Sequence, residues 1–276
     1  MIRDIVVNLS VGERGNAAAG YAVSLASALE AHLAGIAFVY EVIVPMGRMG
    51  YTPAEIIDAL RYDNEVAAKA AIDRFAKTTS LAGVSAEWAT VSVNSASAGD
   101  QFGRIARRFD LAIVGQPEPE PKAAEQKITE SALFDSGRPV IFVPYIQKAP
   151  LKLDRVMVCW DGSRPATRAI ADAMPLLERA RGVEVVIVAN ERGKQTEIEG
   201  ADMGQHLARH GLAVEVHRIT RGDIDVADAL LSHAADAGTD FMVMGGYGHS
   251  RLREFVLGGV THSILRAMTV PVLISH

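Results

Sequence analysis

Short apolar runs alternate with segments of helical periodicity along the whole chain. The runs at residues 4–9, 111–115, 155–159 and 241–245 are almost continuously apolar, as is typical of parallel strands buried on both faces. Between such runs, apolar residues recur at helical spacing, and one face of the first predicted helix carries Ala22, Leu25, Ala26, Leu29 and Leu33. This alternation predicts a doubly wound α/β sheet, whose ligands bind at the carboxyl ends of the strands.

The pattern occurs twice. Four segments match in the same order: residues 4–10 with 155–161, 83–88 with 211–216, 110–115 with 240–245, and 139–143 with 271–275. The sequence therefore predicts two tandem doubly wound, Rossmann-like parallel-sheet domains. We place them at residues 1–149 and 150–276, joined near residues 147–150.

The first copy is longer than the second. The offset between residues 4 and 155 exceeds the offset between residues 83 and 211 by about twenty positions, which places an insertion before residue 83. It falls mostly in residues 41–65, which contain a loop at 45–50 and a helical run from Pro53, a residue that suits the first turn of a helix. Two interpretations of the loop stay open: a lid over a site, or an exposed connection.

Composition narrows the class of protein. The 276 residues are 49% apolar and 22% charged, as in a soluble globular protein, and the net charge of −5 without a basic block disfavours nucleic acid as a partner. No apolar run approaches the ~20 residues that span a bilayer, and the first ten residues do not resemble a signal sequence. The single cysteine, Cys159, excludes an intrachain disulfide and favours a reducing cytoplasm.

A glycine-rich segment in the second copy is the main candidate site. Residues 245–259 read GGYGHSRLREFVLGG, follow a predicted strand and precede a predicted helix. Gly258 and Gly259 then lie at a helix N-terminus, where unpaired N–H groups and the helix dipole favour anions. The alternative is that the glycines only close turns. Neither G-x-G-x-x-G after a first strand nor G-x-x-x-x-G-K-[ST] is present, which disfavours a dehydrogenase-type site and excludes a P-loop.

Other reactive residues indicate a functional site less strongly. His206 and His210 are four apart on a predicted helix with Asp202 one turn earlier, a spacing that can hold a metal, but a solvated surface pair is the favoured interpretation. Cys159 ends a buried strand, which favours inert packing. We therefore assign no catalytic and no metal-ligating residue.

The glycine spacing resembles that of the universal stress protein family in its tandem form. Nucleotide-binding members carry G-x2-G-x9-G-[ST] after the fourth strand, and here Gly259 replaces the final Ser or Thr. The family also has an Asp after the first strand, matched by Asp161, and a closing strand like VPVLISH. The resemblance implies an adenine nucleotide alpha hydrolase-like fold that binds ATP or AMP, with or without Mg. The site residues that it implies are Asp161, Val188, Ala189, Met244, Gly245, Gly248, His249, Gly258, Gly259, Val260 and Thr261.

The first copy lacks the residues that imply nucleotide binding in the second copy. Asn8 stands where Asp161 stands, and residues 116–121 read QPEPEP, in which prolines lack N–H donors and glutamates repel phosphate. We expect this copy to bind no nucleotide in its glycine-loop position and to pair with the second copy. By resemblance, residues 140–143 and 272–274 form the pair of an intrachain pseudo-dimer, and a homodimer stays open.

These expectations combine into one leading function. The sequence predicts a cytoplasmic stress-response binding module with an adenine nucleotide in its second domain. Two alternatives remain: a ligand-free interaction or regulatory protein, motivated by Gly259, and a weak ATPase with slow hydrolysis. We do not expect an efficient enzyme.

Overall fold

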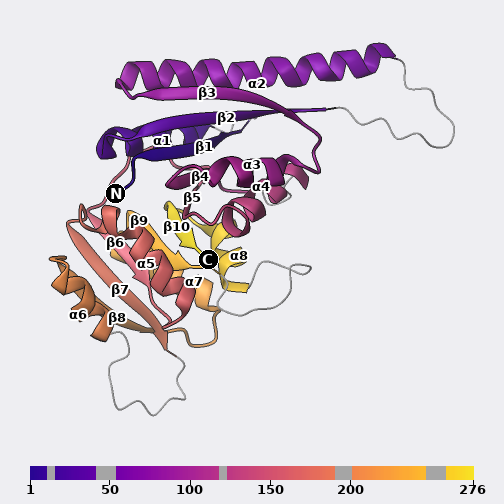
Figure 1. Ribbon diagram of the computed structural model, residues 1–276. Coiled ribbons are helices and arrows are strands. Elements are labelled where there is room, and N and C mark those ends of the chain that lie inside the picture. The colour runs from indigo at the N-terminus through magenta and orange to yellow at the C-terminus, as the bar shows by residue number, and fades with distance from the viewer. Residues whose placement is uncertain (11–15, 42–53, 118–122, 190–200, 247–258) are drawn as a thin grey trace. The chain divides into compact units, whose positions relative to one another are not determined.

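Strands and helices alternate along the chain in the predicted order. The computed structural model describes residues 1–10, 16–41, 54–117, 123–189, 201–246 and 259–276 (Figure 1). The chain divides into a first unit, residues 2–138, and a second unit, residues 139–276 with Met1. Each unit has a mostly parallel sheet with helices packed on it, which confirms the predicted doubly wound α/β class.

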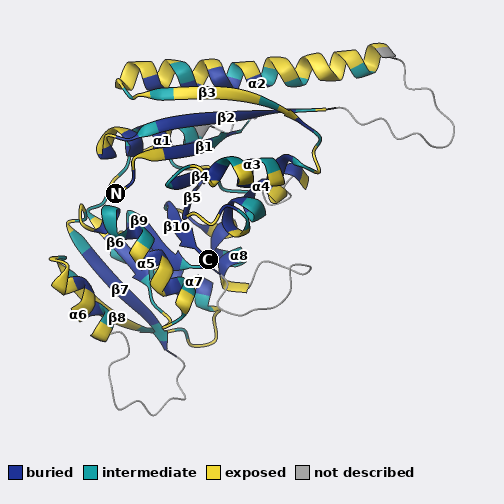
Figure 2. Cartoon of the chain, in the orientation of Figure 1, coloured by how far each residue is buried: buried dark blue, intermediate teal, exposed yellow. Residues whose placement is uncertain are grey.

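The first unit has four parallel strands. They lie in the order β3-β2-β1-β4. Their bounds are β1 (Asp4–Leu9), β2 (His32–Tyr40), β3 (Ala86–Val93) and β4 (Leu111–Gly115). The central strands are buried whereas β3 is exposed along most of its length, as the yellow strand beside α2 in Figure 2 shows. This unit therefore has an open edge at β3.

Four helices accompany these strands: α1 (Asn16–Leu29), α2 (Ala54–Ala82), α3 (Ala98–Ala106) and α4 (Ala123–Phe134). The α2 helix packs on β2, where a Cβ added at Gly35 would lie 2.7 Å from the Phe75 ring. The first helix is shorter than predicted, since Leu33 lies in β2 and not on the face that ends at Leu29. The chain turns at Glu30, whose φ of 53° is left-handed, so an apolar strand residue fell by chance in helical register.

The second unit has six strands in the order β5-β10-β9-β6-β7-β8. Their bounds are β5 (Val140–Val143), β6 (Arg155–Cys159), β7 (Gly182–Ala189), β8 (Val214–Thr220), β9 (Phe241–Gly245) and β10 (Val272–Ser275). All neighbours are parallel except β5 and β10, which pair antiparallel with Ile141 opposite Leu273. The predicted pairing of the two closing strands is confirmed, and it groups β5 with the second unit although β5 precedes residue 150.

The helices of the second unit are α5 (Arg164–Leu177), α6 (Ala201–Arg209), α7 (Val226–Ala237) and α8 (Gly259–Ala267). The α5 helix packs against β9 and β10, while α7 contacts α8 and β7. Because α5 and α6 follow crossovers in one direction and α7 and α8 return, right-handed connections place the two pairs on opposite faces. The central strands are thereby buried on both faces.

An aspartate at the start of the fourth strand of each copy fixes the first strand. Asp110 Oδ2 accepts hydrogen bonds from the backbone N–H groups of Arg3 (2.8 Å) and Asp4 (3.1 Å). In the second unit, Asp240 Oδ2 accepts from the N–H of Arg155 (3.0 Å). The two copies therefore share a side-chain contact as well as a strand order.

The strand registers correct one expected equivalence. Ile5 pairs with Leu111 as Val156 pairs with Phe241, so the two first strands align with Asp4 on Arg155. Counting forward, Asn8 corresponds to Cys159, and Ser10 corresponds to Asp161. The expectation that Asn8 stands at the position of Asp161 is wrong by two residues: the match of residues 4–10 with 155–161 already aligns Ser10 with Asp161, and the strand pairing confirms that alignment.

The insertion in the first copy includes the first part of a long helix. The α2 helix has 29 residues, whereas α6, which occupies the same crossover in the second unit, has 9. The extra length falls before residue 83, as predicted. The loop at residues 45–50 lies outside the described residues, so neither interpretation of it is tested.

Candidate functional site

The carboxyl ends of the second unit's strands meet at one edge. Cys159 at the end of β6 is opposite Val186 of β7 and Met244 of β9, so the three strands end at a similar level. The connection from β6 runs to β7, whereas the connection from the neighbouring strand β9 runs the opposite way to β10. Ligands of such sheets usually bind where the strand order reverses in this manner. This edge carries five of the predicted site residues: Asp161, Val188, Ala189, Met244 and Gly245.

Three further site residues begin α8. This helix joins the parallel strands β9 and β10, so it runs back along the sheet and begins at the same carboxyl edge. Gly259 and Val260 are exposed there, and Thr261 is buried. The remaining predicted residues, Gly248, His249 and Gly258, lie outside the described part of the chain.

The first glycine of the segment is needed for packing. A Cβ added at Gly245 would lie 2.4 Å from the backbone N of Ala166 and 2.6 Å from the carbonyl carbon of Pro165, both in the first turn of α5. The next residue, Gly246, donates its N–H to the carbonyl of Ser275 at 2.8 Å. Gly245 therefore has a reason to be glycine that involves no ligand, since it lets β9 and α5 approach.

The last glycine of the segment, Gly259, is not required for packing as Gly245 is. Among the described residues, no atom beyond its chain neighbours lies within 4 Å of the place where a Cβ of Gly259 would be, and its φ is not in the left-handed range. The backbone at Gly259 therefore accepts a serine or threonine without a steric clash. The missing hydroxyl is a chemical difference from the family motif and not a requirement of packing.

Asp161 has a structural contact of its own. Its Oδ1 accepts a hydrogen bond from the backbone N–H of Ser163 at 2.9 Å, across Gly162 in a left-handed conformation (φ 75°). Ser163 in turn caps α5, because its hydroxyl accepts from the N–H of Ala166 at 3.2 Å. The carboxylate therefore shapes the turn between β6 and α5 while the residue stays exposed at the edge.

Cys159 lies just beneath this turn. Burial of the thiol, together with the nearby charges of Asp161 and Glu184, raises its pKa to about 12. A thiol with this pKa stays protonated at neutral pH and is a poor nucleophile. The structure supports inert packing for Cys159.

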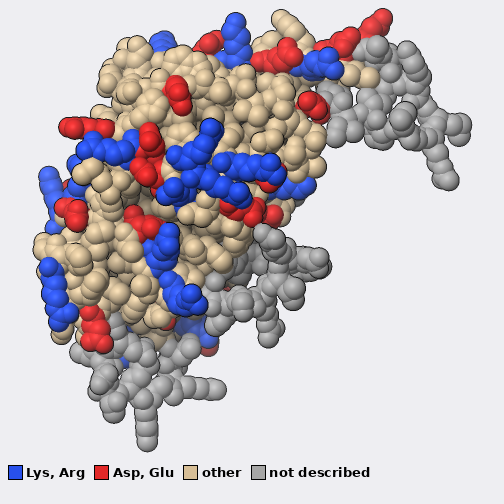
Figure 3. Space-filling view, viewed as in Figure 1, with Lys and Arg blue, Asp and Glu red and all other residues tan. Residues whose placement is uncertain are grey.

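The rings of His206 and His210 lie against each other at the end of α6. The two exposed rings lie edge to face with centroids 4.9 Å apart. Within the described ranges, no group of three or more His, Cys, Asp and Glu residues is arranged to hold a metal ion. In the same part of the chain, no helix is long and apolar enough to cross a membrane. Figure 3 shows basic and acidic side chains interspersed on the visible face.

A polar cluster around a buried glutamate of the second unit was not predicted from the sequence. Glu184 on β7 is 7% exposed, and its Oε1 lies 2.7 Å from Nε2 of His233 on α7 and 3.5 Å from Nε2 of His217 on β8. A glutamate within the apolar run GVEVVIVA was the available signal. Its partners are distant in sequence, so only the fold brings them together.

Comparison with known proteins agrees with this fold. The model of the Universal stress protein family matches residues 152–276. A universal stress protein from Synechocystis sp. is 25% identical over 177 residues, which cover 60% of this chain and 57% of that relative, so the chain spans little more than half of the relative's length.

Solved structures match over the whole chain. A universal stress protein from Archaeoglobus fulgidus DSM 4304 superimposes with a TM-score of 0.76 at 18% identity, covering 99% of this chain and 97% of that one. A protein of unknown function from Pseudomonas aeruginosa PAO1 gives a TM-score of 0.65 at 15% identity, with 99% and 92% covered. At such identities these two matches establish the fold alone. Residues 152–276, somewhat less than half of the chain, therefore match the universal stress protein family.

Proposed function

We propose that the second unit binds an adenine nucleotide, ATP or AMP, at the carboxyl edge of its sheet, and that the chain acts as a cytoplasmic stress-response binding module. The observation that carries the proposal is the pairing of two exposed groups on this edge. The N-terminus of α8 begins at exposed Gly259, and the carboxylate of Asp161 follows the central strand β6. The first can receive phosphate and the second a ribose hydroxyl or Mg²⁺.

Some of the described residues would contact the nucleotide, and others would form the floor of the site. The N–H groups of Gly259, Val260 and Thr261 are in the first turn of α8, where an α-helix leaves its amides without intrahelical acceptors. Val188 and Ala189 end β7 and would border the adenine. We assign Met244 and Gly245 to the floor of the site, because Gly245 packs directly on α5.

The proposed affinity is lower than that of a family member with the full motif. A hydroxyl after the last glycine would donate one hydrogen bond to a charged phosphate, and such a bond contributes about 1.5–3 kcal/mol. Gly259 cannot supply it. The loss corresponds to a dissociation constant raised at least about tenfold.

We propose binding without efficient turnover. Asp161 is the acidic side chain that follows β6, and its Oδ1 is already engaged by the Ser163 N–H. A general base needs an oxygen within reach of the attacking water at an accessible pKa. A carboxylate that holds the turn between β6 and α5 is better suited to orienting a ribose or a metal.

Calorimetric titration of the purified chain with ATP and with AMP tests the proposal. We expect one site per chain that is saturated at millimolar nucleotide. Asp161→Asn keeps an amide oxygen for the Ser163 N–H and removes the charge, so it should weaken binding in the presence of Mg²⁺ without unfolding the unit. Asp236→Asn, an exposed carboxylate on α7, is the matched control and should bind as the parent does. Absence of binding at millimolar ATP and AMP would refute the proposal.

A further inference from the structure

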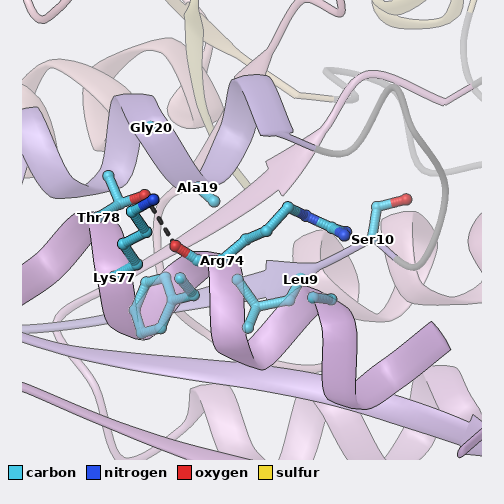
Figure 4. Close-up of a pocket in the computed structure, with 9 residues that line it drawn as sticks. Leu9, Ser10, Ala19, Gly20, Arg74, Lys77 and Thr78 are labelled. Carbon is cyan, nitrogen blue, oxygen red and sulfur yellow. Dashed lines mark hydrogen bonds between the residues drawn. The ribbon is translucent and has the colours of Figure 1, made fainter. Parts of the chain in front are cut away.

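The first unit contains a pocket at the end of β1. It has a volume of about 270 Å³ and lies between the end of β1, the second turn of α1 and the second half of α2 (Figure 4). Six of its lining residues matter to the argument: Leu9, Ser10, Arg74, Phe75, Lys77 and Thr78. The pocket is thus made largely by the helix that carries the insertion.

The floor of this pocket is apolar. Leu9 and Phe75 contribute side chains that are 3% and 1% exposed, and Ala71 of α2 also lines the pocket. These side chains belong to the core of the first unit, so the floor is rigid and its shape is set by packing. A ligand with an apolar body would be desolvated against it.

The rim is polar and carries two positive charges. Figure 4 shows the Arg74 side chain extending along the pocket toward Ser10, the residue after β1, with Lys77 and Thr78 one turn further along α2. The Thr78 hydroxyl donates to the backbone carbonyl of Arg74 at 2.8 Å, which fixes its orientation. The described lining residues include two cations and two hydroxyls, and no acidic side chain is among them.

The positive charge of this pocket contrasts with the charge at the equivalent position of the second unit. Ser10 occupies the position of Asp161, so the carboxylate at the end of the first strand is replaced by a hydroxyl. The long α2 helix adds Arg74 and Lys77 on the same edge. The first strand is therefore followed by a carboxylate in the second unit and by a hydroxyl with two cations near it in the first.

We propose that this pocket binds a small organic anion, a carboxylate on an apolar body. The carboxylate meets the guanidinium fork of Arg74 and the ammonium of Lys77, and Ser10 donates a further hydrogen bond. The apolar body lies on Leu9 and Phe75. A pocket of this volume is near the lower end of ligand sites, so the ligand is the size of one ring or a short branched chain and smaller than a nucleotide.

Benzoate is a suitable probe, with benzamide as its neutral analogue and inorganic phosphate as an anion without an apolar body. Titration of the ¹⁵N-labelled full chain should give shifts at Ser10 and along α2, with benzoate binding at least about tenfold more tightly than either comparison compound. Equal binding of benzoate and benzamide would overturn the assignment of an anion. Phosphate as tight as benzoate would overturn the role of the apolar floor, and no binding of benzoate at 50 mM, roughly the weakest useful affinity, would overturn the site itself.

Variants locate the binding. Lys77→Gln removes one exposed charge, and we expect a loss of affinity of about threefold to tenfold. Lys69→Gln, an exposed lysine on α2 outside the pocket, is the matched control and should bind as the parent does. Gly20→Leu fills the open side of the pocket, where a Cβ has no atom within 4 Å, and should abolish binding without changing the charge. Unchanged affinity in both Lys77→Gln and Gly20→Leu would place the anion elsewhere, as would its loss in Asp161→Ala.

Discussion

The carboxyl edges of the two first strands have the same backbone and opposite chemistry. In each unit an aspartate at the start of the fourth strand receives backbone N–H groups at the start of the first, and the registers of the strands match. Beyond the strand end, the second unit presents Asp161, whereas the first presents Ser10 beside Arg74 and Lys77. The strand pairing is the same in the two units, whereas the residues that follow the strands differ. Loop residues can differ in this way because they have few packing constraints.

The two units can also be compared at the glycine that ends the fourth strand. Gly115 and Gly245 both end the fourth strand of their units. A Cβ at Gly245 would meet the backbone of α5 at 2.4 Å, but a Cβ at Gly115 would meet only the Cβ of Ala18 at 3.8 Å, an ordinary contact. The same glycine is thus required in one copy and replaceable in the other.

The largest effect should separate these two glycines. Gly245→Ala drives a methyl group into the Ala166 amide, so strand β9 and helix α5 must separate, at a cost of about 1–3 kcal/mol in the free energy of unfolding. Gly115→Ala should change stability by no more than about 0.5 kcal/mol. Urea denaturation of both variants measures the difference. Equal losses would show that the close approach of α5 is not specific to the second unit.

The paired aspartates should have effects of similar size in the two units. Asp110→Ala leaves two N–H groups without their acceptor and Asp240→Ala leaves one, so each should lose about 1–2 kcal/mol. Hydrogen exchange should quicken at Arg3 and Asp4 in the first variant and at Arg155 in the second.

Asparagine at either position keeps one acceptor oxygen and should restore most of the protection. Faster exchange in both units from a single variant would contradict the view that each aspartate serves only its own sheet.

Much of the scaffold could be predicted from sequence. Continuous apolar strands, the four internal segment matches and the turn residues predicted the fold class and the duplication, because these depend on periodicity and on local chemistry. The pairing of β5 with β10 was predicted from the resemblance to the universal stress protein family. The position equivalent to Asp161 was misassigned to Asn8, although the match of residues 4–10 with 155–161 aligns it with Ser10, as the hydrogen-bonded register confirms.

The candidate site was predictable in position and less so in the role of each residue. A strand, a glycine segment and a helix indicated the correct edge, but Gly245 was assigned to a ligand whereas its near neighbour is α5. The pocket beside Arg74 left no sequence signal, because its residues come from three elements and share no spacing. Tertiary proximity of this kind is absent from any local pattern.

Restoring the hydroxyl sharpens the comparison between this chain and its family motif. Gly259→Ser adds a donor where no described neighbour lies within 4 Å, and the affinity for ATP or AMP should rise about tenfold. Gly259→Ala is the matched control, since it changes the backbone freedom in the same way without a donor. A gain in the alanine variant equal to that of serine would assign the effect to helix stability and not to the phosphate contact.

The smallest effect concerns the two residues beneath the strand ends, Cys159 and Asn8, of which only the first titrates. The folded thiol has a pKa of about 12 and an unfolded thiol about 8.5, so above pH 8.5 the unfolded state loses the proton first and stability falls as pH rises. Relative to Cys159→Ser, the parent should lose less than about 1 kcal/mol between pH 7.5 and pH 9.

Comparison with the serine variant up to pH 9 isolates this thiol. Burial and the charge of Glu125 raise the pKa of Tyr40 to about 12, and an unfolded tyrosine with a pKa of about 10 is only about a tenth ionised at pH 9, a contribution that the serine variant shares. Labelling with a thiol reagent gives the second readout, since the protonated folded thiol should react at least about tenfold more slowly than the thiol of the urea-unfolded chain. Rapid labelling of the folded chain at pH 7.5, with no pH-dependent difference from the serine variant, would show that the end of β6 is open to solvent. The edge of the second unit would then have no dry floor beneath Asp161, and the contrast with the packed floor of Leu9 and Phe75 would widen.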